Sequence, residues 1–304
     1  MEKCIACNSV LKPFLKCNCD NLFHCARCGL AVLEDKPDSK KAVNFYQKFY
    51  DEQESERFQP LFESIVVFFR KSRVELIESF AKNKGKILDV GFGRPIDLEA
   101  FQQNGWSAYG TQIVPHVVKV AKQRKLNAFL GELQNAHYSS NKFDAITMWH
   151  VLEHLNKPQL YLKEAHRILK KGGTLILEVP NIDSIVAKTF GCNWFEMDVP
   201  HHVYQFTPKS LTLLLERNGF QIEKKTFFSL EQSPFSILQS FLNLFSKRRN
   251  ILFDALKKTH SVSFIIKLLN VLIAILLSPI AILLSVLFAV VGKGDVMRFH
   301  CIKK

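Results

Sequence analysis

Residues 87–93 read Ile-Leu-Asp-Val-Gly-Phe-Gly, a short apolar run that ends in two glycines separated by one residue. Such a run is typical of a buried strand, and glycines at alternate positions let the backbone turn sharply and approach a ligand closely. A helical pattern begins near residue 96, so the unpaired N–H groups of its first turn would face the same point. This strand–turn–helix unit decides the fold only together with the segments around it.

The flanking sequence alternates between strand and helix patterns. We expect strands at 86–90, 107–111, 126–130, 143–148, 174–179, 220–228 and 295–302, and helices at 96–104, 115–124, 158–170 and 208–218. Two further helices are expected upstream, at 42–58 and 61–82. Alternation of this kind predicts an α/β fold in which helices cover both faces of a largely parallel sheet. An apolar content of 47% with ordinary Gly and Pro excludes a disordered, collagen-like or simple coiled-coil chain.

Three further tracts follow the glycine turn in a characteristic order. They read FDAITMWHVLEHL at 143–155, LKKGGTLILEVPN at 169–181 and WFEMDVPHHVYQFTPKSL at 194–211. With these pieces the chain resembles the class I S-adenosylmethionine-dependent methyltransferases. The tract at 194–211 further resembles a branch that includes ubiquinone-type O-methyltransferases and many sugar or glycan methyltransferases. The resemblance covers residues 84–228 and 294–304 and implies a Rossmann-like sheet of seven strands.

The resemblance assigns residues to the cofactor. Asp89, Gly91 and Gly93 match the first loop, Gln112 stands where the family has a ribose-binding acid, and Glu132 and Leu133 match the adenine position, while Met148 and Trp149 would border the sulfonium. Two positions depart from the family pattern. Pro95 replaces a third glycine and removes a backbone N–H, and Gln112 offers hydroxyls a hydrogen bond without charge assistance.

A histidine pair provides the candidate base. Removing a proton from an accepting hydroxyl needs a group that titrates near neutrality, and His201 and His202 follow the sheet on the ligand side. The family histidine aligns best with His202, so we expect His202 to be the catalytic base, with His201 second; a role in shaping the pocket is the alternative. The sequence His150-x-x-Glu153-His154 also matches a zinc-protease pattern. Its position after a strand favours a packed, hydrogen-bonded turn beside the cofactor.

Six of the eight cysteines fall in the first 28 residues. Cys4 and Cys7 form one thiol pair, and Cys25 and Cys28 form another, which is the spacing of a zinc ribbon with four thiolate ligands. Cys17, Cys19 and His24 are spare candidates, and Cys17 or Cys19 could replace one ligand. A disulfide framework is the alternative, and it would require secretion, for which Met1 to Cys4 offer no signal peptide. We expect the zinc to be structural.

The charge is concentrated at one end. Of the formal net charge of +13, residues 229–304 contribute +7, from ten basic and three acidic side chains. The same region holds an uncharged apolar run from Leu268 to Val291, long enough as a helix to cross a bilayer core of about 30 Å. Because strand 295–302 must return to the sheet, a single span is excluded. Since Pro279 divides the run, we expect a membrane-dipping helical hairpin or an in-plane amphipathic pair, with a buried cap or dimer helix as the alternative.

These observations predict five regions and one activity. The regions are a zinc-ribbon-like segment (1–34), N-terminal helices (35–83), the S-adenosylmethionine-binding core (84–228), a basic membrane-associating insertion (229–293) and the last core strand (294–304). We expect an O-methyltransferase that acts at the cytoplasmic membrane surface on a lipid-linked, glycan or quinone-like acceptor. Nucleic acid is a less favoured partner, because the cysteine segment is barely basic. The alternatives are an RNA or protein methyltransferase and a catalytically lapsed scaffold.

Overall fold

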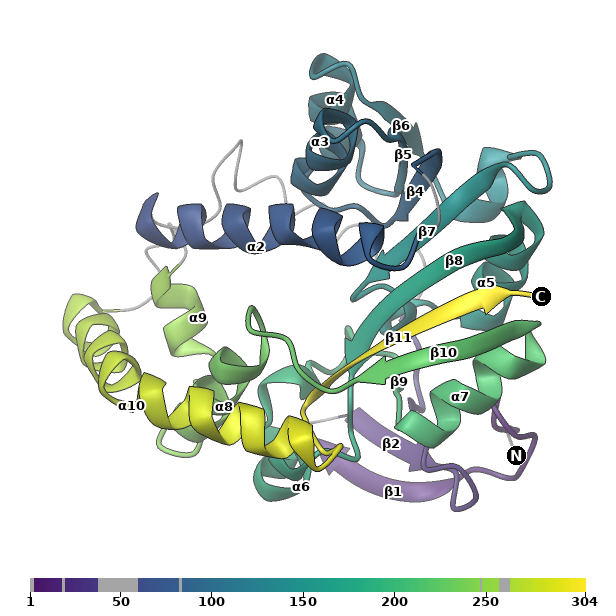
Figure 1. The fold of residues 1–304 in the computed structure, drawn as a ribbon. Coiled ribbons are helices and arrows are strands. Elements are labelled where there is room, and N and C mark those ends of the chain that lie inside the picture. The colour runs from purple at the N-terminus through teal and green to yellow at the C-terminus, as the bar shows by residue number, and fades with distance from the viewer. Residues whose placement is uncertain (1–2, 18–19, 38–59, 82–83, 247, 257–262) are drawn as a thin grey trace.

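The computed structural model describes residues 3–17, 20–37, 60–81, 84–246, 248–256 and 263–304. Its centre is a seven-stranded sheet in the order β10-β11-β8-β7-β4-β5-β6 (Figure 1). The strands are β4 (Lys86–Val90), β5 (Ser107–Gln112), β6 (Asn127–Leu130), β7 (Phe143–Trp149), β8 (Leu169–Pro180), β10 (Phe220–Thr226) and β11 (Val296–Lys303). β4 to β8 pair in parallel, and β11 runs antiparallel to both β8 and β10. The expected α/β fold, with a last strand inserted between its neighbours, is confirmed.

Helices cover both faces of this sheet. One face carries α2 (Pro60–Glu78), α3 (Ile96–Gln103) and α4 (Pro115–Gln123), which share a buried apolar cluster. The other carries α5 (Pro158–Ile168) and α7 (Pro208–Arg217). α7 begins where expected because the Thr207 side chain accepts a hydrogen bond from the Ser210 backbone N–H and Pro208 supplies a pre-set first turn. The helix expected at 42–58 lies outside the described residues.

The cysteine segment is joined to the core through a shared sheet. Its strands β1 (Lys12–Cys17), β2 (Asp20–His24) and β3 (Ala31–Leu33) continue into β9 (Tyr204–Gln205), in the order β1-β2-β3-β9. The Thr207 hydroxyl also donates a hydrogen bond to the Cys28 carbonyl oxygen at 2.7 Å. Two regions that are some 180 residues apart in sequence are therefore fixed to each other by backbone pairing and a buried hydrogen bond.

Between β8 and β11 the chain builds a helical layer. It comprises α6 (Ile185–Phe190), the short helices η3 (Gly191–Asn193) and η4 (Phe195–Met197), α8 (Ser233–Asn243), α9 (Ile251–Leu256) and α10 (Phe264–Val290). Two further short helices, η1 (Leu133–Ala136) and η2 (Leu152–His154), follow β6 and β7. α8 packs against both α10 and the η3–η4 turn, so it is the middle element of this layer.

The expected hairpin or pair of helices at the apolar run is wrong: the run forms one continuous helix, α10, with Pro279 inside it. A proline in a helix removes the N–H that would bond the carbonyl four residues earlier. Here that carbonyl belongs to Ile275, and the Ser278 hydroxyl donates to it at 2.8 Å. The neighbouring serine thus replaces the missing donor, and the helix continues through the proline.

Candidate functional site

The carboxyl ends of β4, β5 and β7 meet at one edge of the sheet, where a cofactor binds in folds of this class. Gly91 and Gly93 follow β4 with φ of +69° and +53°, a region that glycine adopts without strain. A side chain at Gly91 would place its Cβ 2.7 Å from Cγ2 of Val151. The turn therefore requires glycine both for its backbone conformation and for its close approach to the segment after β7.

Asp89 lies in β4, two residues before Gly91, and is 1% exposed. Its Oδ1 accepts a hydrogen bond from the Thr147 hydroxyl at 2.7 Å, whereas its Oδ2 has no hydrogen-bond partner among the described residues. Burial, together with the nearby Asp97 carboxylate, raises the pKa of Asp89 to about 7. An unsatisfied buried oxygen at the sheet edge is costly, so a polar ligand that reached it would be stabilised.

Gln112 ends β5 as expected but turns its amide carbonyl toward its own backbone. Oε1 accepts hydrogen bonds from the N–H groups of Ile113 at 2.7 Å and Val114 at 3.3 Å. The NH₂ group, a donor, is therefore the part of this side chain that is left for a ligand. After β6, Glu132 is exposed, whereas the Leu133 side chain is completely buried in the core.

Trp149 ends β7, and its ring contacts two guanidinium groups. Arg73 of α2 lies over its ring at 4.3 Å from the centroid and Arg298 of β11 lies 5.3 Å from it. Arg73 is 6% exposed and pairs with Asp97 at 3.0 Å and with Glu231 at 2.9 Å. These ion pairs hold α2 over the edge of the sheet. Sequence reasoning missed Arg73, although its spacing from Ile77 places it on the inward stripe of α2.

His150 follows Trp149 in a left-handed conformation, with φ of +51°. Its ring nitrogens lie 3.2 Å from an oxygen of Glu153 and 3.2 Å from an oxygen of Glu178. Burial disfavours the charged ring, but the contacts with the two carboxylates outweigh it and raise the pKa of His150 well above its usual value. Glu178 is also bound by Arg298. His150 thus pairs with carboxylates, as expected for a packed turn rather than a zinc-protease site.

His202 lies beside this turn and is 5% exposed. Its Nδ1 is 2.7 Å from the Glu196 carbonyl oxygen, which can only accept, so Nδ1 carries the proton and Nε2 keeps a free lone pair. The His154 ring packs edge-on against it at 4.6 Å, and burial lowers the pKa of His154 to about 4. His201 is more exposed and contacts Asp198 at 3.2 Å. Of the two rings, His202 is thus the more buried and the one with a fixed tautomer.

Glu153, His154 and His202 also place one ligand atom each within 4.8 Å of the others. Glu153 is completely buried, and its Oε1 already lies 3.2 Å from Nδ1 of His150. Two imidazole nitrogens and one carboxylate form a donor set that can hold a divalent ion. This grouping differs from the H-x-x-E-H pattern, because His202 from the later loop takes the place of His150.

The four expected thiol ligands converge. The sulfurs of Cys4, Cys7, Cys25 and Cys28 lie within 4.8 Å of one another, and all four side chains are buried. Each pair sits in the same kind of turn, since the N–H of Asn8 bonds the Cys4 carbonyl and the N–H of Gly29 bonds the Cys25 carbonyl. Both Asn8 and Gly29 have positive φ. Four thiolates around one point match tetrahedral zinc, so the residues present fit this ion.

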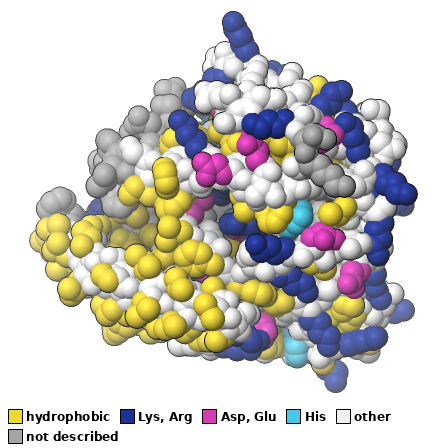
Figure 2. All heavy atoms as spheres, in the orientation of Figure 1, with side chains coloured by type: hydrophobic (Ala, Val, Ile, Leu, Met, Phe, Trp, Pro, Cys, Tyr) yellow, Lys and Arg dark blue, Asp and Glu magenta, His cyan; other side chains and the backbone are white. Residues whose placement is uncertain are grey.

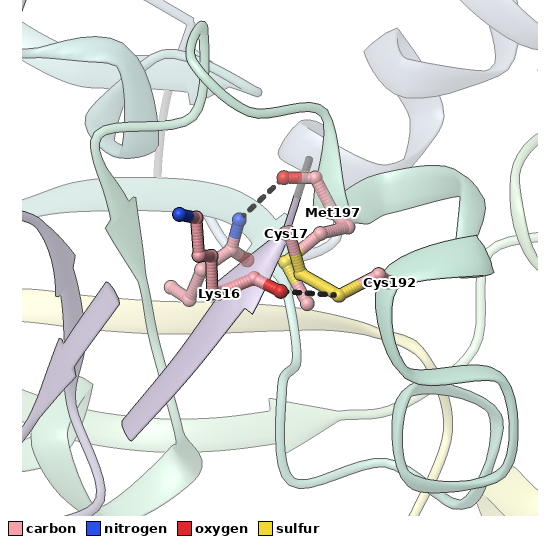
Figure 3. The surroundings of a disulfide bond; sticks show 5 residues. Lys16, Cys17, Cys192 and Met197 are labelled. Atoms are coloured by element: carbon pink, nitrogen blue, oxygen red, sulfur yellow. Dashed lines mark hydrogen bonds between the residues drawn. A yellow bond between two sulfur atoms is a disulfide. The ribbon is translucent and has the colours of Figure 1, made fainter. Parts of the chain in front are cut away.

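The role expected for Cys17 as a spare ligand is wrong, because Cys17 forms a disulfide with Cys192 (Figure 3). Their Cα atoms are 5.4 Å apart although the two residues are separated by 175 positions in sequence. The bond joins the end of β1 to η3, close to Met197 of η4. His24 is absent from the thiol cluster and packs against Phe14, while Cys19 lies outside the described residues.

The comparisons agree with this geometry. A model of the methyltransferase domain family matches residues 55–225, more than half of the chain. The chain belongs to this family. Relatives include an uncharacterised protein of Methanocaldococcus jannaschii, 25% identical over 49% of this chain, of whose length the chain spans 64%. A ubiquinone biosynthesis O-methyltransferase of Coxiella burnetii is 26% identical over 49% of this chain and 70% of that protein.

A solved S-adenosylmethionine-dependent methyltransferase from Archaeoglobus fulgidus shares the fold, with a TM-score of 0.50 and 19% identity. The match covers 78% of this chain and 94% of that one. The glycine turn, the unsatisfied Asp89 oxygen and the donor end of Gln112 fit a cofactor that carries an amino acid and a ribose. These residues would hold S-adenosylmethionine, which supplies an activated methyl group when bound.

Proposed function

We propose that this protein is an S-adenosylmethionine-dependent O-methyltransferase. The observation that carries the proposal is His202, whose Nδ1 is fixed by the Glu196 carbonyl so that Nε2 is left as the proton acceptor, with the ring beside His154 of the turn after β7. The family match supports methyl transfer, and the imidazole supplies the proton acceptor that a hydroxyl nucleophile needs.

The residues divide the work between binding and proton transfer. Gly91, Gly93 and Gln112 would hold the cofactor, and Arg73 would keep Trp149 in place beside it. His202 would remove the proton from the accepting hydroxyl as the methyl group is transferred. Burial lowers the pKa of the neighbouring His154 to about 4, so His154 is neutral near pH 7. The thiol cluster would hold a structural zinc.

We further propose an amphipathic acceptor, such as a lipid-linked glycan precursor or a quinone, methylated at the cytoplasmic membrane surface. The support is the apolar α10, one helix long and apolar enough to cross a membrane, and the +7 charge of residues 229–304. Zinc thiolates are common in reducing compartments. The Cys17–Cys192 bond points the other way, because disulfides persist mainly in oxidising ones. Mass spectrometry of the alkylated protein taken from cells would show whether Cys17 and Cys192 are bonded, and so decide between a reducing and an oxidising compartment.

Calorimetry with S-adenosylmethionine and its demethylated product tests the cofactor, and a radiolabelled methyl-transfer assay with quinol and lipid-linked glycan acceptors tests the reaction. We expect binding of both nucleosides and transfer to a hydroxyl. Absence of binding would establish the catalytically lapsed scaffold instead, a reading that the inward-turned Gln112 carbonyl favours. Transfer to RNA or protein, but to no amphipathic acceptor, would overturn the acceptor class.

A further inference from the structure

The surface of α10 is inverted relative to an ordinary surface helix. A helix at the surface of a soluble protein turns its apolar side inward and its polar side to water. In α10 the buried positions are the small residues Ala274, Ala281 and Ser285. Its exposed residues are all Ile, Leu, Val or Pro, among them Ile265, Leu268, Leu269, Leu272, Ile275, Leu276, Ile282, Leu283, Val286, Leu287 and Val290. Figure 2 shows these hydrophobic side chains gathered along the helix.

The polar residues of α10 avoid this face. Lys267, Asn270 and Ser278 are half-buried, and Ser285 is 2% exposed with its hydroxyl bonded to the Ile282 carbonyl. The outward face therefore offers a partner no hydrogen-bonding group. Protein interfaces carry about one hydrogen bond per 100–200 Å², whereas the acyl region of a bilayer needs none. The chemistry of the face matches lipid better than a second protein surface.

The helix is fixed to the fold at its C-terminal end and along its length. Ala274 and Ala281 belong to the apolar cluster that includes Leu238 and Leu242 of α8, and Ser285, one turn later, is also buried. After α10, the carbonyl oxygens of Lys293, Gly294 and Asp295 accept hydrogen bonds from Ile185 and from the backbone and side chain of Asn181. The next residues enter the central sheet as β11. A helix held in this way cannot stand upright in a bilayer without leaving its own fold.

We propose that α10 docks in the plane of a phospholipid bilayer, with the face that includes Leu272, Leu276 and Leu283 inserted among the acyl chains. At 1.5 Å per residue its 27 residues extend about 40 Å along the membrane. Phe241, Leu244 and Phe245, at the end of α8 and in the turn that follows, are also exposed and enlarge the apolar surface. Arg248 and Arg249 follow these residues, and their positive charge would complement an anionic leaflet.

The docked helix is connected to the candidate site through α8. The Ser240 hydroxyl of α8 accepts a hydrogen bond from the Phe195 N–H at 2.9 Å, and Asn243 donates to the Asn193 carbonyl at 3.1 Å. The segment that leads to His201 and His202 is thus attached to the helix whose opposite side carries α10. This step rests on the proposed function: the acceptor would reach His202 from the lipid, not from bulk water.

Flotation of the full-length protein with vesicles tests the docking without any methyl donor. On vesicles of phosphatidylcholine and phosphatidylglycerol we expect flotation that survives a high-salt wash and is lost in detergent. The triple variant Leu272→Ser, Leu276→Ser, Leu283→Ser should reduce vesicle binding at least tenfold. Leu160→Ser, at an exposed leucine of α5, is the matched control and should bind as the unmodified protein does. Equal flotation of the triple variant would overturn the proposal.

Tryptophan scanning separates the in-plane arrangement from a span. Leu272→Trp, Leu283→Trp and Val290→Trp lie on one face along the helix, and the three native tryptophans are at most 7% exposed. Lipids brominated at one depth should quench all three introduced side chains equally. A steady change of depth from 272 to 290 would overturn the in-plane reading, as would a stable dimer that the triple variant dissolves and that binds no vesicles. Calorimetry with S-adenosylmethionine on the same variants reports separately on the proposed function.

Discussion

The replacement His202→Asn tests the assigned base while keeping the loop in place. The asparagine side-chain NH₂ can occupy the position of the histidine Nδ1 and donate to the Glu196 carbonyl, which lies 2.7 Å from that atom. It has no counterpart of Nε2, so the proton acceptor is lost. Loss of a general base lowers turnover by about 10²- to 10⁴-fold, or roughly 3–5 kcal/mol of barrier.

A second variant, His202→Ala, removes both the proton acceptor and the hydrogen bond to the Glu196 carbonyl. Its buried Glu196 carbonyl is left without a donor, which costs about 1–3 kcal/mol of folding free energy in addition to the lost rate. Single-turnover methyl transfer and urea unfolding should therefore separate the two variants, whereas S-adenosylmethionine affinity should stay constant in both. His201→Asn, at the more exposed ring, should slow transfer by less than about tenfold. Wild-type turnover by His202→Asn would refute the assignment.

Three further changes test other parts of the molecule. Thr207→Ala removes the cap of α7 and the bond to the Cys28 carbonyl, so urea unfolding should show a loss of about 2 kcal/mol, whereas Thr212→Ala on the same helix should cost less than about 1 kcal/mol. Burial raises the pKa of Glu196 from 4.5 to about 8, so ionisation favours the unfolded chain, and stability falls as pH rises through that window; thermal unfolding of Glu196→Gln should lack this fall. Chelation of zinc should raise amide hydrogen exchange in β1, β2 and β3, whereas the amides that pair β4 with β7 should stay protected. Equal protection of β1, β2 and β3 with and without the chelator would contradict a metal role.

Local patterns were enough to predict the sheet and the glycine turn that follows β4. The apolar run before Gly91 and the glycine spacing specify a buried strand and a turn, because both signals depend only on near neighbours. The spacing of Cys4, Cys7, Cys25 and Cys28 likewise predicted a cluster, since four thiols in two tight turns have few other arrangements. The positions of the strands along the chain followed from the same alternation of patterns.

Two contacts that could not be predicted from the sequence join segments that are far apart along the chain. Arg73 stacks on Trp149, 76 positions later, and Cys17 bonds Cys192, and neither residue carries a local sign of its partner. Gln112 was expected at a ligand, but its own backbone satisfies its carbonyl first. Pro279 suggested a break because prolines usually end helices, and only the Ser278 hydroxyl at the freed carbonyl explains the continuity. For Gln112 and Pro279, a hydrogen bond at a single side-chain atom decided the observed conformation.

The pairing of β3 with β9 changes what counts as a separable part of this molecule. Val32 pairs with Tyr204, two residues beyond His202, so β3, the last strand of the cysteine segment, lies beside the loop that carries the candidate base. Residues 1–34 look like an appended module in the sequence, yet an expression fragment without them would remove the strand that pairs with β9 and the Cys28 carbonyl that accepts from the Thr207 hydroxyl. Transplanting residues 84–228 alone into another protein would therefore carry over the cofactor turn but not the support of the histidine loop.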